Sequence, residues 1–256
     1  MTNLVYVYAV LDKPLALQAQ GINRQPVRWI DDERLIAAVS DVPEAEFGEE
    51  PLNAGVSDMQ WLGPRALAHQ DVNQQLFEGA DALIPLSFGT VFRDDARVQQ
   101  MLRQQQEGLR ARLDRVRGRS EWVVAVHRTA RPDAAESKAL QALQAEIDAT
   151  SPGRAHLLKQ RYAGLERDEL RRLEGEAIDH VLDALRSSAD DVFVEPLPND
   201  VVDRPLLRAS VLVPRQAEAD FVDAIAALET AWYRVLVTGP WPPYRFGGLK
   251  HAAAVR

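Results

Sequence analysis

The 256-residue chain contains no cysteine. This absence excludes a disulfide framework, Cys-ligated zinc, an iron–sulfur cluster and a thiol nucleophile. Apolar residues make up 46% of the chain, but no apolar run approaches the length of a membrane span. The first residues carry neither a basic region nor a small-residue cleavage site, which argues against a secretory signal. We therefore expect a soluble cytoplasmic protein.

Basic side chains are also in deficit, with 30 Lys and Arg against 38 Asp and Glu, giving a formal net charge of −8. A negative chain is repelled by nucleic-acid phosphates unless it carries a local basic patch. Such a patch exists between Arg110 and Arg119, but it has no interleaved aromatic residues. We therefore expect no nucleic-acid partner.

Motifs for catalysis and metal binding are scarce. Glu176, His180 and Asp183 could share one helix face, but there is no His-Glu-x-x-His core, so a solvated face explains them more simply. No Gly-x-Ser-x-Gly elbow surrounds Ser87. Carboxylate pairs such as Asp94-Asp95 stand where helices begin, which is typical of capping. The sequence thus predicts no catalytic residue, no metal site and no cofactor.

The first half of the chain mixes strands and helices. Residues 4–10 read as a buried strand, and residues 26–30 and 34–40 as a hairpin. Residues 41–55 are acidic and contain Pro and Gly, which indicates a loop, either a lid or a surface excursion. A helix is expected after an N-cap at Ser57, with Gly63-Pro64 as a break or as its true start. A short strand at 82–88 and a helix from Asp94 follow, and the helix carries an apolar stripe of Val98, Leu102, Leu109, Leu113 and Val116.

The second half has a recognisable order of elements. Strand, helix, strand, strand, helix and strand are predicted in turn, and a turn at 150–154 interrupts the long helical region 132–189. This order is that of the split βαβ, ferredoxin-like arrangement. The predicted fold class is therefore α+β with two domains. The first is a mixed α/β domain over residues 1–118, and the second is a modified ferredoxin-like domain over 119–239 with a long helical insertion. Residues 240–256 form a Pro/aromatic segment that packs back on the fold.

Two segments combine aromatic residues with chain-turning residues. In "LIPLSFGTVFRDD", Phe88 and Phe92 flank a Gly-Thr pair, and Arg93 precedes a helix. In "TGPWPPYRFGG", three prolines separate Trp241, Tyr244 and Phe246. Proline fixes φ and removes a backbone donor, so this second segment cannot be a regular helix or a central strand. Either segment could fold over the chain's own core or could anchor a partner.

The same two segments, taken over residues 82–102 and residues 235–249, resemble the two hallmark segments of the gas vesicle protein GvpF/GvpL family. The opening strand "YVYAV", the segment "WLGPRALAHQDV" and the segment "SPGRAHLLKQR" support the resemblance in the family's order. Two positions differ. Ser87 stands where the family more often has a basic residue. Arg245 and Gly247-Gly248 stand where the second hallmark segment of the family ends in a different sequence.

The resemblance implies a non-enzymatic accessory or minor structural protein for gas vesicle assembly, associated with gas vesicles. It also implies a two-domain α+β fold whose C-terminal domain is a modified ferredoxin-like fold. The implied partners are the hydrophobic shell protein GvpA and other accessory proteins. If exposed, the expected partner-binding residues are Phe88, Phe92, Arg93, Trp241, Tyr244 and Phe246. An enzymatic or small-molecule-binding α+β protein that shares only the fold is the alternative, and a nucleic-acid binder is a third.

Overall fold

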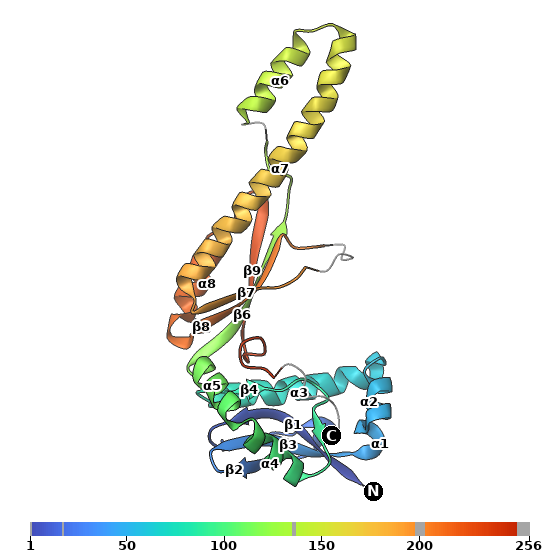
Figure 1. The fold of residues 1–256 in the computed structure, drawn as a ribbon, viewed down its shortest axis with the longest axis vertical. Helices are drawn as coiled ribbons and strands as arrows, with labels where there is room; N and C mark the ends of the chain where they lie inside the picture. Colours follow the sequence, from blue (N-terminus) through green and yellow to red (C-terminus); the bar gives the residue numbers. More distant parts are fainter. Residues whose placement is uncertain (1, 17, 135–136, 198–202, 250–256) are drawn as a thin grey trace. The chain divides into compact units, whose positions relative to one another are not determined.

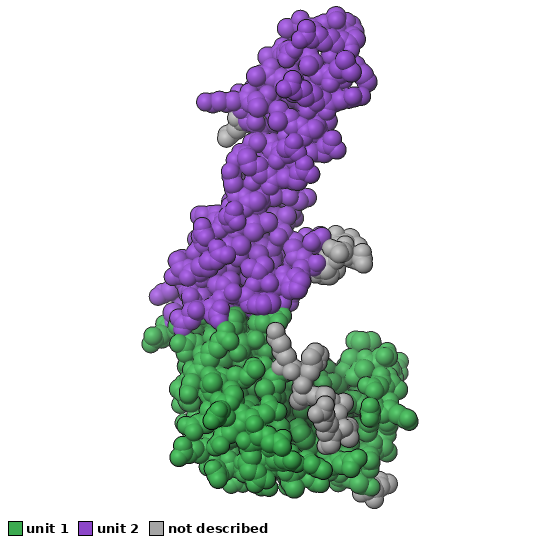
Figure 2. Space-filling view, in the orientation of Figure 1, with its two compact units in different colours: residues 1–122, 212–216, 239–256 green, residues 123–211, 217–238 purple. Residues whose placement is uncertain are grey.

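The computed structural model describes residues 2–16, 18–134, 137–197 and 203–249. Over these residues the fold is α+β, with two sheets and eight α-helices (Figure 1). The chain divides into two compact units, coloured separately in Figure 2. Unit 1 comprises residues 1–122, 212–216 and 239–256, and unit 2 comprises residues 123–211 and 217–238. The predicted domain boundaries at 118 and 239 stay a prediction, and residues 250–256 of the predicted C-terminal segment lie outside the described residues.

The sheet of unit 1 is built around strand β1 (Asn3–Leu11). It pairs antiparallel with β3 (Leu35–Pro43) on one side, and with the short strands β4 (Ile84–Pro85) and β5 (Val91–Phe92) on the other. Strand β2 (Arg28–Asp32) completes the sheet by pairing with β3, which confirms the predicted hairpin. A short 3-10 turn (Ile22–Arg24) precedes β2.

Both faces of β1 are buried, because eight of its nine residues have almost no exposed surface. Val5, Val7 and Val10 face a core completed by helices α4 (Asp95–Gln104) and α5 (Gln106–Val116). The opposite core contains Tyr6, Tyr8 and side chains from the helices between β3 and β4. The predicted apolar stripe is confirmed, since all five of its residues are buried. The prediction that a single helix carries it was wrong, because the helix is divided at Gln105 into α4 and α5. Unit 1 is therefore a sheet between two helical layers.

The prediction of a loop over residues 41–55 was wrong. This stretch continues β3 and then forms two short helices, α1 (Glu44–Phe47) and α2 (Glu49–Gly55). Acidic residues in both first turns favour these helices through the helix dipole, and Pro51 stands in a first turn where its missing N–H is not needed. Phe47 and Leu52 are buried, so the stretch belongs to the core.

Helix α3 (Met59–Gly79) begins one residue later than predicted and is not broken. The Asp58 carboxylate, rather than Ser57, caps it by accepting a hydrogen bond from the Gln60 amide at 2.9 Å. Pro64 lies inside the helix. A residue before proline is normally pushed away from helical geometry by contact between its Cβ and the ring, and Gly63 has no Cβ. This pair is therefore compatible with a continuous helix.

The second sheet has the strand order β7-β8-β6-β9. Its strands are β6 (Arg119–Arg128), β7 (Asp191–Val194), β8 (Leu207–Pro214) and β9 (Tyr233–Trp241). Backbone hydrogen bonds join Leu206 to Val126 and Thr129 to Trp232. Strand β9 extends through Pro240 to Trp241, further than predicted. Proline is tolerated there because β9 is an edge strand.

The helices of unit 2 confirm the predicted interruption of the long helical region. Helix α6 (Lys138–Asp148) ends before the turn, and α7 (Pro152–Ser188) then runs for 37 residues. Figure 1 shows α6 lying along the first half of α7. A short 3-10 turn (Arg215–Ala217) and helix α8 (Glu218–Ala226) lie between β8 and β9. Among the described residues, no helix is both long and apolar enough to span a membrane.

Candidate functional site

The six predicted site residues differ in exposure. Trp241 is 40% exposed and Arg93 is also exposed. Phe88, Phe92 and Tyr244 are half-buried, whereas Phe246 is only 4% exposed. All six belong to unit 1, and two of the residues, Phe88 and Tyr244, lie close to helix α3.

The first hallmark segment, residues 82–102, forms a tight corner between β4 and α4. The Leu86 amide donates to the Tyr8 carbonyl at 2.8 Å, and the Thr90 hydroxyl donates to the Ser87 carbonyl at 2.7 Å. Gly89 has a φ of +82°, a conformation that favours glycine, and its amide donates to the Tyr6 hydroxyl at 3.0 Å. The Val7 amide also donates to the Thr90 carbonyl at 2.9 Å, so hydrogen bonds tie the corner to β1 at three points.

Phe88 enters a cluster of rings at this corner. Its ring lies edge-on to Tyr6, His69 and Trp61, with centroids 5.8 to 6.3 Å apart. Aromatic pairs in this geometry add about 0.5–1.5 kcal/mol beyond their buried area. The ring cluster therefore stabilises the fold, and Phe88 as a whole residue is half-buried.

The second hallmark segment, residues 235–249, is bonded to α3, to α5 and to Glu121. The Tyr244 hydroxyl accepts from the Asn73 amide at 3.0 Å and donates to Gln70 at 3.2 Å. The Arg245 backbone amide donates to the Glu121 carboxylate at 2.7 Å.

Phe246 lies in the core, and the Arg115 guanidinium stands 5.6 Å from the centre of its ring. The Gly248 carbonyl accepts from Arg112 at 3.0 Å. A Cβ at Gly248 would lie 2.3 Å from the Tyr244 carbonyl oxygen, so a side chain does not fit there without movement. The Gly247-Gly248 ending, where the chain departs from the family pattern, is therefore part of a close turn.

A buried polar chain links the two hallmark segments through α3. The Asn73 amide group donates both to Tyr244 and to Nε2 of His69, at 3.0 Å. Nδ1 of His69 lies 2.9 Å from the Tyr6 hydroxyl oxygen and is hydrogen-bonded to it. Tyr6 also accepts from Gly89, so the chain runs from the first segment to the second without a gap.

Burial keeps this polar chain uncharged near neutral pH. It lowers the pKa of His69 to about 4, against the smaller opposing effect of a hydrogen bond with the Leu86 backbone. Burial raises the pKa of Tyr6 well above its usual value, and it raises the pKa of Tyr244 to about 12. Neutral groups that are hydrogen-bonded to one another in this way are suited to holding segments together, although the buried Oδ1 of Asn73 has no partner among the described residues.

His69 and Asn73 were not predicted as site residues. Both lie on the buried side of α3, beside the apolar residues Val72 and Leu76. The available signal was their i,i+4 spacing on an apolar helix face, which indicates a pair of polar groups that bond each other inside a core.

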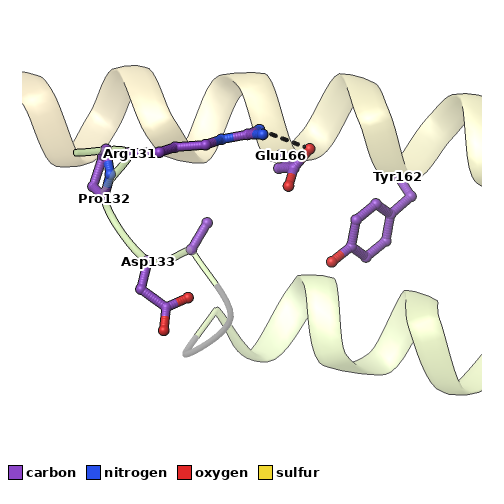
Figure 3. Close-up of a pocket in the computed structure, with 6 residues that line it drawn as sticks. Arg131, Pro132, Asp133, Tyr162 and Glu166 are labelled. Carbon is purple, nitrogen blue, oxygen red and sulfur yellow. Dashed lines mark ion pairs between the residues drawn. The ribbon is translucent and has the colours of Figure 1, made fainter.

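A separate cavity lies in unit 2 between α7 and the chain that follows β6. Arg131, Pro132, Asp133, Ala134, Tyr162 and Glu166 line it. Figure 3 shows the Arg131 guanidinium reaching Glu166, with which it forms an ion pair at 2.9 Å. Among the described residues that line it there is no serine, threonine, cysteine or histidine, the residues that usually form a nucleophile and base pair. Across the residues with described positions, no three His, Asp or Glu side chains are grouped to hold a metal ion.

Comparison with known proteins decides the family. A family model described as "Gas vesicle synthesis protein GvpL/GvpF" matches residues 4–247. The chain belongs to the GvpL/GvpF family. Both hallmark segments lie almost wholly within the matched range, so the resemblance inferred from them is confirmed.

Named relatives match this chain along almost its whole length. Gas vesicle protein L of Streptomyces sp. (strain CB03234) is 32% identical, over 96% of this chain and 93% of the relative. Gas vesicle protein F of the same strain is 29% identical, over 94% and 98%. Gas vesicle protein F of Haloferax mediterranei is 23% identical, over 96% and 94%.

Solved structures agree at the level of the fold. The crystal structure of the gas vesicle protein GvpF from Anabaena sp. PCC7120 superposes with a TM-score of 0.68 at 20% identity, covering 97% of this chain and 98% of that one. GvpF from Microcystis aeruginosa gives a TM-score of 0.64 at 21% identity, covering 96% and 99%. The α+β architecture of this GvpL/GvpF-family chain is therefore shared with solved GvpF proteins.

Proposed function

We propose that this protein is a non-enzymatic accessory or minor structural protein of gas vesicle assembly, which binds the shell protein GvpA and other accessory proteins. The observation that carries the proposal is the match to the GvpL/GvpF family model over residues 4–247. We place its action in the cytoplasm, in association with gas vesicles.

The physical task we assign is to shield or nucleate shell subunits before assembly. A subunit destined for a dry, gas-facing wall exposes apolar area while it is free, and exposed apolar area promotes aggregation. Binding sites for such surfaces commonly use a few aromatic anchors inside a polar rim. Trp241 and Arg93 meet the exposure condition for such anchors, whereas Phe88 and Phe92 are half-buried and packed against the core. Phe246 does not meet it, and the Tyr244 hydroxyl is already bonded within the fold.

We further propose that residues 119–239 form a modified ferredoxin-like domain. The strand order β7-β8-β6-β9 supports this, because it places the first and third strands of the unit at the centre and the second and fourth at the edges. The helical hairpin of α6 and α7 is the long insertion between the first two strands.

Gene deletion tests the assembly role. We expect loss or marked reduction of intact vesicles in the deletant, restored by the wild-type gene. Normal vesicle numbers without the gene would contradict the role.

Trp241→Ala tests the anchor in a binding titration of the purified protein with the purified shell protein. Leu236→Ala is the matched control, because Leu236 is 45% exposed on the same strand as Trp241. We expect Trp241→Ala to weaken binding of the shell protein by at least about tenfold, the loss of a moderate hot spot, while Leu236→Ala has little effect. Equal binding by both variants, with both folded, would remove Trp241 from the proposed contact.

A further inference from the structure

The first half of helix α3 carries an apolar face that the described chain does not cover. Met59 is 75% exposed and Leu67 is 66% exposed. Gly63 lies between them, and a Cβ placed there would meet no atom within 4 Å. Val56, just before the helix, is 43% exposed. Large apolar side chains left together in water on one helix face are typical of a contact surface.

The same side of α3 is covered further along. Met59, Gly63, Gln70 and Phe77 are spaced by four and seven residues, so they share one side of the helix. Gln70 accepts from Tyr244, and the Arg215 guanidinium lies 4.5 Å from the centre of the Phe77 ring. The described part of the chain thus closes the second half of this side and leaves the first half open.

The surroundings of the open face are strongly acidic. Residues 44–79 contain seven carboxylates and one arginine. Glu44, Glu49, Glu50, Asp58 and Asp71 are exposed. The single cation, Arg65, is engaged by Glu46 at 2.7 Å, with its guanidinium over the Trp61 ring. The rim of the apolar face is therefore rich in exposed carboxylates.

We propose that this face, defined by Val56, Met59, Gly63 and Leu67, docks an amphipathic α-helix of a partner protein whose apolar stripe is bordered by lysine and arginine. The apolar stripe would cover Met59 and Leu67, and Gly63 would allow close approach of the partner backbone. The basic border would meet the acidic rim, which favours this partner over others. An anionic membrane surface carries the wrong charge, and so does the same face of a second copy.

This inference rests on the proposed function, because it names a surface and a partner chemistry for assembly by protein–protein contact. The test uses the purified full-length chain and model peptides of roughly 18 residues, a length that forms several helical turns. The first peptide places leucine at helical spacing with lysine on the remaining positions. The second has the same composition in scrambled order, so it carries the same charge without an apolar face.

Titration calorimetry should show binding of the amphipathic peptide that weakens with salt, and at least about tenfold weaker binding of the scrambled peptide. Met59→Gln combined with Leu67→Gln should remove this difference. Glu49→Gln combined with Glu50→Gln should reduce affinity and its salt dependence. Leu157→Gln is the matched control, because Leu157 is also 66% exposed on a helix but lies in unit 2. It should leave binding unchanged.

Several results would overturn the proposal. These are equal binding of both peptides, binding unaffected by the Met59/Leu67 double substitution, or an equal loss with Leu157→Gln. Binding of the protein to phosphatidylglycerol vesicles that is lost in the Met59/Leu67 double variant would also contradict it. So would a dimer, detected by sedimentation, that the same double substitution dissociates. If peptide binding fails while gene deletion still abolishes vesicles, only this surface is wrong. Normal vesicles in the deletant would instead overturn the assembly role and leave the peptide result standing.

Discussion

The two halves of helix α3 have opposite surroundings. In the second half, His69, Asn73 and Phe77 are buried and bonded or packed against segments distant in the sequence. In the first half, Met59 and Leu67 are mostly exposed, and acidic residues surround them. One continuous helix thus serves the fold at one end and presents a surface at the other. Substitutions in the two halves should therefore separate stability from binding.

The buried second half of α3 also indicates what the hallmark segments do. Gly89 of the first segment and Tyr244 of the second join one hydrogen-bonded chain through α3. Most of their aromatic residues are held by the protein itself, so the segments that identify the family contribute largely to its fold. The exposed groups, Trp241 and Arg93, are the exceptions.

The largest expected effect comes from Phe246→Ala. This side chain is 4% exposed and packs in the core beside α5, so its removal leaves a cavity. Phenylalanine-to-alanine changes in cores cost about 3–5 kcal/mol in the free energy of unfolding. Denaturant unfolding followed by tryptophan fluorescence measures the loss. A loss below about 1 kcal/mol would show that the second hallmark segment does not stabilise unit 1.

The next effect is a dependence of stability on pH. The folded pKa of His69, about 4, lies below its usual value of 6.5, so the unfolded chain binds the proton more readily between these values. The stabilisation is therefore complete above the unfolded pKa and is lost as pH falls towards the folded pKa, by up to about 3 kcal/mol. Tyr6, Tyr8 and Asn73 surround the ring, and none supplies a compensating negative charge at these pH values.

Unfolding curves measured between pH 7 and pH 4 test this dependence. His69→Gln should flatten it, whereas His180→Gln, at an exposed position on α7, should leave it unchanged. The same slope in His69→Gln as in the wild type would show that other groups cause the dependence.

A smaller loss is expected for Tyr244→Phe. The change removes one hydroxyl and leaves the Asn73 and Gln70 amides without that partner, at a cost of about 1–2 kcal/mol. Tyr162→Phe removes the same group from a half-buried phenol of α7 and serves as the control. A double-mutant cycle with Asn73→Ala should give a coupling above about 0.5 kcal/mol, because the two side chains contact each other. Strictly additive losses would contradict the buried chain.

The smallest effect on stability is expected in the first half of α3. Met59→Gln and Leu67→Gln change exposed side chains and should alter the free energy of unfolding by no more than about 0.5 kcal/mol. Thermal and denaturant unfolding provide the measurement. A loss of several kcal/mol would show that this half is packed in solution and is not an open surface.

Sequence patterns predicted the elements of this protein better than its contacts. Periodicity located β1, the hairpin and the apolar stripe of α4 and α5, because these depend on local alternation and helical spacing. It missed α1 and α2, where Pro and Gly suggested a loop but Phe47 and Leu52 are held by a distant core. The link between Tyr6, His69, Asn73 and Tyr244 spans most of the chain, so no local pattern could reveal it.

Hydrogen exchange across α3 tests the central claim most directly. The full-length protein is compared alone and with the purified shell protein, and exchange is followed in the two halves of the helix. We predict that the shell protein slows exchange at residues 56–67 and leaves residues 72–77 unchanged, because the second half is already closed by the hallmark segments. Slower exchange confined to residues 72–77 and 242–248, with residues 56–67 unaffected, would contradict the account.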